Sequence, residues 1–248
     1  MKTALITGSG SPTGIGMAIA RAMAGQGHRL VITSTTGRIQ LRAAELAAEG
    51  AGVRAFQGDL TDPATVGRLA DLAGPVDILV NNAGMASIAE PVAPRGFLDL
   101  TMEDWRRQID VSLTSAVLVT RAFLPGMLDR GFGRVVMMSS VTGPLVSYPG
   151  ASHYAAAKAG MMGLVRSLAL EVAAQGVTVN GIAPGWIDTG ALSRKERSAA
   201  RATPPRRAGT PAEVAACAAF LASDGAAYVN GSLLVVDGGN CLQEMKGG

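Results

Sequence analysis

Short runs of apolar residues alternate along the chain with longer stretches in which apolar residues recur at helical spacing. The short runs predict strands at residues 4–6, 30–32, 53–56, 77–80, 134–138, 177–182 and 233–236. These runs are continuous and β-branched rather than alternating, which is typical of strands covered on both faces in a parallel sheet. The stretches between them predict helices at residues 14–25, 38–49, 152–174 and 211–222, and two more that begin near 63 and 101.

Local residues mark where some of these helices begin and end. Thr101 to Asp104 resembles a capped helix start, and Thr210 followed by Pro211 is a favourable N-cap and first residue. Pro125 is expected to end or kink the helix that begins near Thr101, because proline lacks a backbone donor and its ring clashes with the preceding turn.

Alternating strands and helices, joined by right-handed crossovers, predict an α/β fold with a doubly wound parallel sheet of about seven strands and helices on both faces. The 248 residues show no linker, repeat or charge block, and 48% of them are hydrophobic, so we expect a single domain over residues 1–248. Such sheets bind ligands at the carboxyl ends of their strands.

Charge and cysteine content exclude several classes of protein. The net charge is +3, and its basic residues are scattered except at 194–207, which we expect to be a solvated loop rather than a nucleic-acid surface. Cys217 is expected to be a small core residue, and with Cys241 it does not make a disulfide framework. The apolar start is too short for a signal peptide, and no apolar run approaches the ~18 residues of a membrane span. We therefore expect a cytoplasmic protein without membrane or nucleic-acid partners.

A glycine-rich turn follows the first predicted strand and opens the first predicted helix. It reads Thr7-Gly8-Ser9-Gly10-Ser11-Pro12-Thr13-Gly14-Ile15-Gly16. Glycines let the backbone turn tightly and approach a pyrophosphate, and the helix N-terminus attracts its negative charge. This order of strand, turn and helix predicts a dinucleotide site.

The end of the second predicted strand bears on which dinucleotide is bound. An NAD enzyme usually places a carboxylate there for the ribose 2′-hydroxyl, whereas an NADP enzyme places hydroxyl groups or arginine near the 2′-phosphate. No carboxylate stands at this strand end, and Ser34, Thr35 and Arg38 suit a phosphate. Arg38 could equally be an ordinary residue of the first helical turn. The pattern favours NADP(H) over NAD(H).

Tyr154 and Lys158 are the candidate catalytic pair, with Ser140 upstream. Residues four apart share one helix face. A free phenol has a pKa of ~10, and we expect the Lys158 ammonium and an oxidised nicotinamide to lower the pKa of Tyr154. Tyr154 would then act as the acid in carbonyl reduction or the base in alcohol oxidation, while Ser140 holds the substrate oxygen.

These motifs together resemble the short-chain dehydrogenase/reductase family over essentially the whole chain, which implies a Rossmann fold and a nicotinamide cofactor. The family's turn is Thr-Gly-x-x-x-Gly-x-Gly, whereas five residues separate Gly8 from Gly14 here. Either the turn carries two extra residues, or Gly10 takes the place of the first glycine. We prefer the first alternative, because Thr7-Gly8 directly ends the strand.

The resemblance implies further cofactor contacts. Asp59-Leu60 would contact the adenine, Asn81-Asn82-Ala83-Gly84 matches a family motif after the fourth strand, and Lys158 would hold the nicotinamide ribose. Ile187 and Thr189, in the loop after Pro184-Gly185, would lie by the nicotinamide carboxamide. The expected cofactor-binding residues are Gly8, Ser9, Gly14, Ile15, Ser34, Thr35, Arg38, Asp59, Leu60, Asn82, Ala83, Gly84, Tyr154, Lys158, Pro184, Gly185, Ile187 and Thr189.

Two positions depart from the family pattern. Ser140 precedes Tyr154 by fourteen positions, one more than is common in the family, and Ser139 is the neighbouring alternative. Ser112 stands where the family has an asparagine that binds a water of the proton relay; its hydroxyl can still bind water, and we include it among the catalytic residues.

Only two histidines are present, and no ligand cluster accompanies them, so no metal is expected. We expect His153 to be a pocket-edge or surface residue rather than a second base.

The substrate is less defined. The chain resembles 3-oxoacyl-carrier-protein reductases and related ketoreductases most, but residues 85–100 look longer than in that group. The expected function is reduction of a ketone or 3-oxoacyl substrate, with a lid at about 190–207. The alternatives are an alcohol, polyol or steroid dehydrogenase, and a nucleotide-binding regulator without turnover.

The resemblance also implies a homo-oligomer, expected to be a tetramer. Small or apolar faces on two helices would allow close approach of subunits, although packing within one subunit explains them too. These faces hold Ala155, Ala156, Ala159 and Gly160, and Val111, Ser115 and Leu118.

Overall fold

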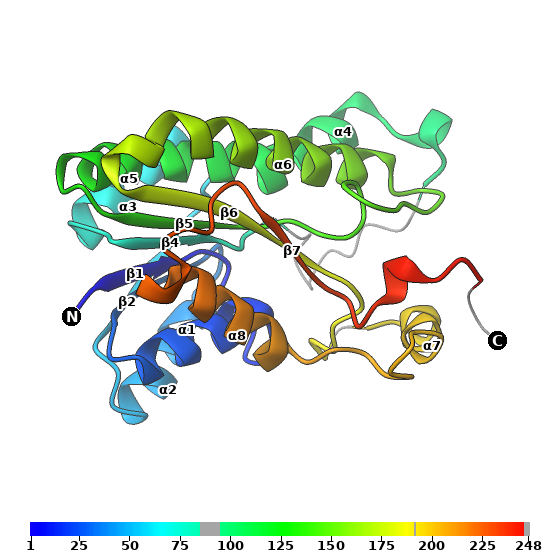
Figure 1. Ribbon diagram of the computed structural model, residues 1–248, viewed down its shortest axis with the longest axis horizontal. Coiled ribbons are helices and arrows are strands. Elements are labelled where there is room, and N and C mark those ends of the chain that lie inside the picture. The colour runs from blue at the N-terminus through cyan, green and yellow to red at the C-terminus, as the bar shows by residue number, and fades with distance from the viewer. Residues whose placement is uncertain (85–94, 191, 246–248) are drawn as a thin grey trace.

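The fold is a seven-stranded parallel sheet with helices on both faces (Figure 1). It was obtained as a computed structural model that describes residues 1–84, 95–190 and 192–245. The strands are β1 (Thr3–Ile6), β2 (Arg29–Ser34), β3 (Val53–Gln57), β4 (Ile78–Asn81), β5 (Gly133–Met138), β6 (Val177–Pro184) and β7 (Leu233–Val236). Their order in the sheet is β3-β2-β1-β4-β5-β6-β7, and every neighbouring pair is parallel. The predicted fold class is confirmed.

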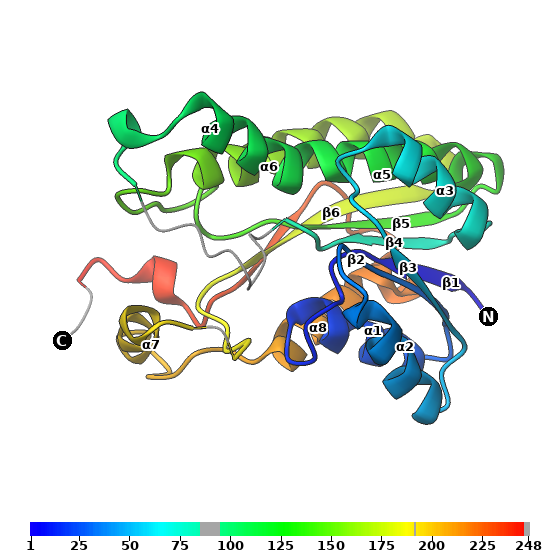
Figure 2. The same cartoon turned by 180° about the vertical axis from the view of Figure 1, so that it is seen from behind.

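The described part of the chain has eight α-helices, and six of them cover the two faces of the sheet (Figure 2). They are α1 (Ile15–Gly25), α2 (Arg38–Ala48), α3 (Pro63–Ala73), α4 (Met102–Ile109), α5 (Ser115–Asp129), α6 (Ser152–Val172), α7 (Arg194–Arg201) and α8 (Pro211–Ala222). Helices α1, α2 and α8 lie on one face, and α3, α5 and α6 lie on the other.

The two faces enclose separate apolar cores. Alternate residues of one strand enter opposite cores: Ile6 packs under α1 and α8, whereas Leu5 packs under α3 and α5. Burial of both faces explains why the strands lack polar alternation. Cys217 of α8 is partly buried against the first core, and neither it nor Cys241 forms a disulfide.

The long helix that begins after Thr101 is interrupted by a π-helical turn at Asp110–Thr114, which separates α4 from α5. It does not end at Pro125, because α5 continues to Asp129. Length and composition alone would let Met102–Asp129 cross a membrane, since its most apolar stretch has a mean hydropathy of 1.5. Core helices of soluble proteins meet the same criterion, and the inner face of α5 packs into the second core.

Helix α7 corrects the prediction of a loop over residues 194–207. Ser193 caps its start, accepting a hydrogen bond from the Glu196 backbone N–H while the Glu196 carboxylate accepts one from the Ser193 N–H. This Ser-x-x-Glu capping box is visible in the sequence and is a helix-start signal. The surrounding arginines and prolines are typical of a loop, and they obscure that signal.

Candidate active site

The strand order reverses between β1 and β4, so their carboxyl ends should flank the ligand crevice. Asn82, just after β4, joins the end of β4 to the end of β1 by hydrogen bonds. Its side-chain Nδ2 donates to Thr7 O at 3.0 Å and to Gly8 O at 3.1 Å. The backbone N–H groups of Asn82 and Ala83 donate to Thr7 Oγ1 at 3.0 and 2.9 Å. The matched Asn-Asn-Ala-Gly motif thus holds the glycine-rich turn against β4.

The glycines of the turn leave no room for side chains. Gly8 has φ +71°, and a Cβ there would lie 2.9 Å from Ala83 Cα. A Cβ on Gly16 would lie 2.5 Å from Gly8 O, whereas Gly10 packs against Ser34. Gly8 and Gly16 therefore meet each other, which favours the alternative with two extra residues between Gly8 and Gly14.

Ser9 is the one predicted contact of the turn that the structure turns away from the crevice. Its backbone N–H donates to Thr33 O at 2.8 Å, its hydroxyl donates to Ile6 O at 3.3 Å, and its side chain is fully buried. Both of its donors are therefore committed to the protein. Ser9 therefore has no free donor to offer a cofactor.

The starts of α1 and α2 can both meet the anionic parts of a dinucleotide, but through different groups. Helices α1 and α2 start at Gly14 and Gly37, which provide no side-chain cap, and neither helix has an acidic residue in its first turn. By contrast, side chains cap α3, α4, α7 and α8. The first N–H groups of α1 have no intrahelical partner, so this end can bind phosphate oxygens. At α2, the Ile39 and Gln40 N–H groups already donate to Thr36 O and Gly37 O, so the group that can bind a phosphate there is the Arg38 guanidinium. The residues present thus fit the pyrophosphate and an additional phosphate.

Arg38 is the first residue of α2 and is exposed beside the end of β2. Ser34 lies at the end of β2, and its hydroxyl is 3.4 Å from Thr36 Oγ1. Thr35, the next residue, is exposed. The three residues predicted to hold a 2′-phosphate are therefore close to one another, between the end of β2 and the start of α2. Asp59 follows β3, where its Oδ1 accepts from the Thr61 backbone and hydroxyl at 3.0 and 2.8 Å, and Leu60 is buried.

Ser140, Tyr154 and Lys158 meet beyond the carboxyl end of β5. A hydrogen bond links Ser140 with Tyr154, and the Lys158 Nζ lies 5.8 Å from the centre of the Tyr154 ring. Lys158 is buried and donates to Met138 O at 2.8 Å. The Ser139 hydroxyl instead donates to Lys158 O at 2.9 Å. The geometry therefore favours Ser140 over Ser139 as the partner of Tyr154.

Burial governs the protonation of both groups. It raises the pKa of Tyr154, and the hydrogen bond with Ser140 opposes this only in part. It lowers the pKa of Lys158 from 10.5 to about 8. In the protein without cofactor the pKa of Tyr154 is thus raised rather than lowered, because desolvation disfavours both charged forms. The lowering expected from Lys158 together with an oxidised nicotinamide stays a prediction.

Ser112 lies in the π-helical turn and is fully buried at the site. Its hydroxyl donates to Gly84 O at 2.5 Å and accepts from Gln108 Nε2 at 2.6 Å. A Cβ on Gly84 would lie 3.1 Å from Ser112 Cα and 3.2 Å from Lys158 Nζ. Gly84 therefore brings Ser112 close to Lys158. Gln108 is not among the residues predicted from the sequence, although its position one helical turn before Ser112 could have indicated it.

The loop after β6 faces the glycine-rich turn. Pro184 is the last residue of β6 and Gly185 donates to Val236 O at 2.9 Å, which fixes the start of the loop. Ile187 is buried, whereas Thr189 is half-buried. Thr189 O accepts a hydrogen bond from Thr13 Oγ1 at 2.6 Å. Loop and turn thus approach each other at the carboxyl edge of the sheet.

His153 does not lie at the surface. It is buried, and no described group satisfies its Nδ1. Burial lowers its pKa, and the nearby Asp104 carboxylate opposes this. The surface alternative is therefore wrong, and the pocket-edge alternative stays a prediction.

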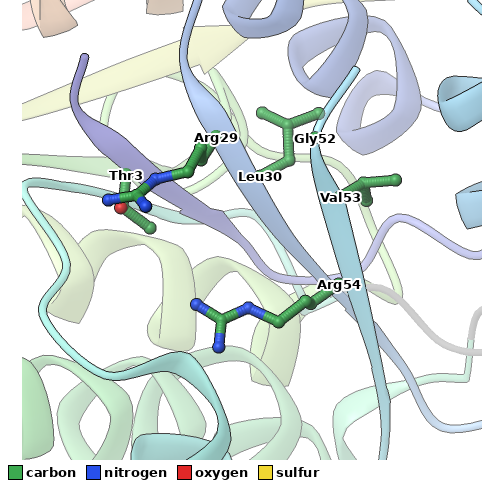
Figure 3. Close-up of a pocket in the computed structure, with 6 residues that line it drawn as sticks. All are labelled: Thr3, Arg29, Leu30, Gly52, Val53 and Arg54. Carbon is green, nitrogen blue, oxygen red and sulfur yellow. The ribbon is translucent and has the colours of Figure 1, made fainter. Parts of the chain in front are cut away.

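A cavity of about 300 Å³ lies at the opposite edge of the sheet (Figure 3). Its lining residues come from where β1, β2 and β3 begin, and they include Arg29 and Arg54. Arg54 already donates to Leu72 O and Ala73 O at the end of α3. No carboxylate, histidine or tyrosine is among its lining residues, so it is not the reaction site. Residues 1–84, 95–190 and 192–245 also contain no cluster of metal-ligating side chains.

Comparison with known proteins agrees with this geometry. A family model described as enoyl-(acyl carrier protein) reductase matches residues 8–240. Oxidoreductase UcpA of Escherichia coli is 40% identical, with 98% of this chain and 95% of the relative covered. The 3-oxoacyl-[acyl-carrier-protein] reductase FabG of Escherichia coli is 39% identical, with 96% of each chain covered.

A solved structure from Beutenbergia cavernae is described as an NAD(P)-dependent gluconate 5-dehydrogenase with NADP bound at low occupancy. It is 35% identical and superimposes with a TM-score of 0.89 over 98% of this chain and 97% of the other. Fold, site and relatives thus agree, and the chain belongs to the short-chain dehydrogenase/reductase family of oxidoreductases.

Proposed function

We propose that this oxidoreductase uses NADP(H) to reduce a ketone or 3-oxoacyl substrate, with Tyr154 as the proton donor. The observation that carries the proposal is the half-buried Tyr154 with its hydrogen bond to Ser140. Burial raises the pKa of Tyr154 and keeps it a neutral phenol at ordinary pH. A neutral phenol can donate the proton that a developing alkoxide requires.

The remaining groups position the reactants. When bound, the nicotinamide cofactor supplies or accepts the hydride. Ser140 donates to the substrate oxygen and stabilises the negative charge that develops there. Lys158 holds the ribose through its ammonium group, and Ile187 and Thr189 orient the carboxamide.

The other cofactor contacts are proposed from the family resemblance. Backbone groups at the α1 N-terminus bind the pyrophosphate, and Asp59 and Leu60 contact the adenine. The pyrophosphate and nicotinamide regions are held by Gly8, Gly14, Ile15, Asn82, Ala83, Gly84, Pro184 and Gly185.

Three features support NADP(H). Ser34, Thr35 and Arg38 adjoin the uncapped α2 N-terminus. A 2′-phosphate placed there would gain the Arg38 guanidinium and the neighbouring hydroxyl groups. No carboxylate stands at the end of β2 to bind a ribose 2′-hydroxyl.

A second candidate is oxidation of an alcohol or polyol. It is favoured by the similarity to the Beutenbergia structure and to an Agrobacterium tumefaciens structure described as a gluconate dehydrogenase, which is 33% identical with a TM-score of 0.88. A sugar acid such as gluconate carries a carboxylate and several hydroxyls. It differs from a 3-oxoacyl thioester in charge and reaction direction, so kinetics can separate the two.

The experiment is a substrate panel assayed with both cofactors. Ketones and 3-oxoacyl thioesters are reduced with NADPH or NADH, and alcohols and sugar acids are oxidised with the corresponding oxidised forms. We expect the highest kcat/KM for a carbonyl substrate with NADPH. A higher kcat/KM for a sugar acid in the oxidative direction would favour the second candidate.

We further propose a cytoplasmic homotetramer. Ala156, Ala159 and Gly160 are exposed on α6, as the predicted contact face requires. Ser115 does not belong to that face, because it is buried and donates to Val111 O at 2.7 Å.

Helix α7, with the residues around it, is the proposed lid over the substrate.

A further inference from the structure

The glycine-rich turn and the loop after β6 are joined by one side chain. Thr13 Oγ1 donates to Thr189 O at 2.6 Å. Thr13 directly precedes Gly14, the N-cap of α1, where the pyrophosphate would bind. Thr189 precedes the segment that leads to α7. The bond therefore connects two loops that are 176 positions apart in the chain.

The loop is shaped to present the Thr189 carbonyl. Asp188 N–H donates to Gly209 O at 2.8 Å, and Gly190 N–H donates to Asp188 Oδ1 at 3.2 Å. Gly190 has φ +80°, and a Cβ there would lie 3.0 Å from Thr13 Oγ1. A glycine therefore suits this position for two reasons: its backbone conformation and its close approach to Thr13.

Thr13 is the last residue of the turn, directly before Gly14, and from there its hydroxyl reaches the loop. Five residues lie between Gly8 and Gly14, and Gly8 and Gly16 already meet each other without them. The turn therefore bulges between its two anchored ends, and its last residue carries the hydroxyl that crosses to Thr189. Packing of the turn alone does not require this hydroxyl, because Thr13 is exposed.

We propose that Thr13 is a positioning residue that closes the glycine-rich turn onto the Thr189 loop and retains the bound dinucleotide. The bond links the turn at the pyrophosphate to the loop at the nicotinamide. Because it is a single exposed neutral hydrogen bond, it can open for each exchange of cofactor. While closed, it also fixes the main chain of Thr189 and the base of the lid that contains α7.

The test compares two substitutions that differ only in hydrogen bonding and branching. Thr13→Val keeps the shape of the side chain and removes the donor, whereas Thr13→Ser keeps the donor. Ser167→Ala is the control, because it removes an exposed hydroxyl that bonds only Glu171 on α6. Release of the reduced cofactor is followed by stopped-flow fluorescence, using whichever nucleotide the parent binds more tightly. The comparison is therefore independent of the proposed preference for NADP(H).

We expect Thr13→Val to release cofactor about two- to ten-fold faster than the parent, the size expected for one neutral hydrogen bond. Thr13→Ser and Ser167→Ala should release it at the parent rate. A second measurement needs no cofactor: trypsin should cut within the arginine- and lysine-rich α7 faster in Thr13→Val, while the melting temperature stays near that of the parent.

Two results would overturn the proposal. The first is an unchanged release rate and unchanged trypsin cleavage in Thr13→Val. The second is an equal change in Thr13→Val and Thr13→Ser, since that would assign the effect to the shape of the turn rather than to the hydrogen bond.

Discussion

Gln108 and Ser112 lie one helical turn apart and share a hydrogen bond of 2.6 Å from Gln108 Nε2 to Ser112 Oγ. The Ser112 hydroxyl in turn donates to Gly84 O. The family resemblance places an asparagine amide at residue 112. Here a serine hydroxyl stands at that position and a glutamine amide contacts it from the preceding turn. The two side chains therefore act as a unit beside Lys158.

We predict that Ser112→Ala and Gln108→Ala each lower kcat several-fold and that their effects are not additive. Removing either partner breaks the same hydrogen bond, so the double variant should lose less than the two single losses combined. The expected coupling is about 1 kcal/mol, the net value of one hydrogen bond. Measuring kcat against pH for the four proteins checks this, and additive losses with an unchanged pH profile would contradict it.

Ser112→Asn tests whether a larger side chain fits at this position. Ser112 is fully buried, and a Cβ on Gly84 would already lie 3.1 Å from its Cα. A longer amide must displace Gln108 or strain the π-helical turn, and overpacking typically costs ~1–3 kcal/mol. We therefore expect loss of stability rather than improved turnover. Thermal unfolding of Ser112→Asn, alone and with Gln108→Ala, would show whether removing Gln108 restores the room.

We predict that Tyr154→Phe lowers turnover by about 10²–10⁴-fold, the usual contribution of a general acid or base. Phenylalanine keeps the ring over Lys158 but has no proton to donate. Cofactor affinity, measured by fluorescence titration, should change little. Tyr228→Phe is the matched control, because Tyr228 is fully exposed after α8. Activity of Tyr154→Phe within a few-fold of the parent would contradict the assignment.

Much of this fold follows from hydrophobic patterning, because a strand covered on both faces of a parallel sheet must be apolar along its whole length. The predicted strand at 233–236 and helix at 211–222 have the observed bounds, since apolar residues and turn signals coincide there. The π-helical turn could not be predicted, because it has the same apolar pattern as an α-helix. Pro125 removes one backbone N–H donor from α5. The helix nevertheless continues past it to Asp129.

The positions of the candidate site residues could be predicted from the sequence, but their hydrogen bonds and pKa values could not. Strand ends and motif spacing place Ser140, Tyr154 and Lys158 near one another. Sequence alone does not reveal that Lys158 donates to Met138 O or that desolvation dominates the pKa of Tyr154. Nor does it reveal that Ser9 is buried against the sheet. Each of these depends on packing between segments distant in the chain.

We predict that Arg38→Ala weakens NADPH more than NADH. Arg38 starts α2 beside Ser34, so its guanidinium can reach a 2′-phosphate that NADH lacks. The expected change in kcat/KM is about ten-fold or more for NADPH, from ~1.5–3 kcal/mol for a hydrogen bond to a charged group. Arg42→Ala is the control, since Arg42 lies one turn further and pairs with Glu45. Equal losses with both cofactors would make Arg38 a structural residue.

We predict that Ala159→Arg disrupts the oligomer. Ala159 is exposed on α6 next to Gly160, so a subunit packed closely there would meet a long charged side chain. Light scattering should give about four times the 25.2 kDa chain mass for the parent and a smaller assembly for the variant. Ala47→Arg, on the exposed face of α2, should leave the mass unchanged. A parent that is monomeric at micromolar concentration would reject the tetramer.

The last prediction concerns Lys158 and pH. Burial lowers its pKa from 10.5 to about 8, so the ammonium is present below pH 8 and is lost above it. If this ammonium holds the ribose, cofactor affinity should fall as the pH rises through 8. Lys158→Met should bind more weakly at pH 7 and show no such fall, so fluorescence titration of both proteins between pH 6.5 and 9.5 would check the prediction.

The predicted fall in cofactor affinity above pH 8 cannot come from Lys158 destabilising the folded protein. Between about pH 8 and 10.5 the unfolded chain keeps the Lys158 proton and the folded chain has lost it. Stability rises with pH wherever the unfolded state binds more protons. The contribution of Lys158 to stability therefore increases over the range in which cofactor affinity should decrease. A loss of affinity above pH 8 without a fall in melting temperature would assign the effect to the ammonium, and a flat affinity profile in the parent would show that Lys158 does not hold the cofactor through its charge.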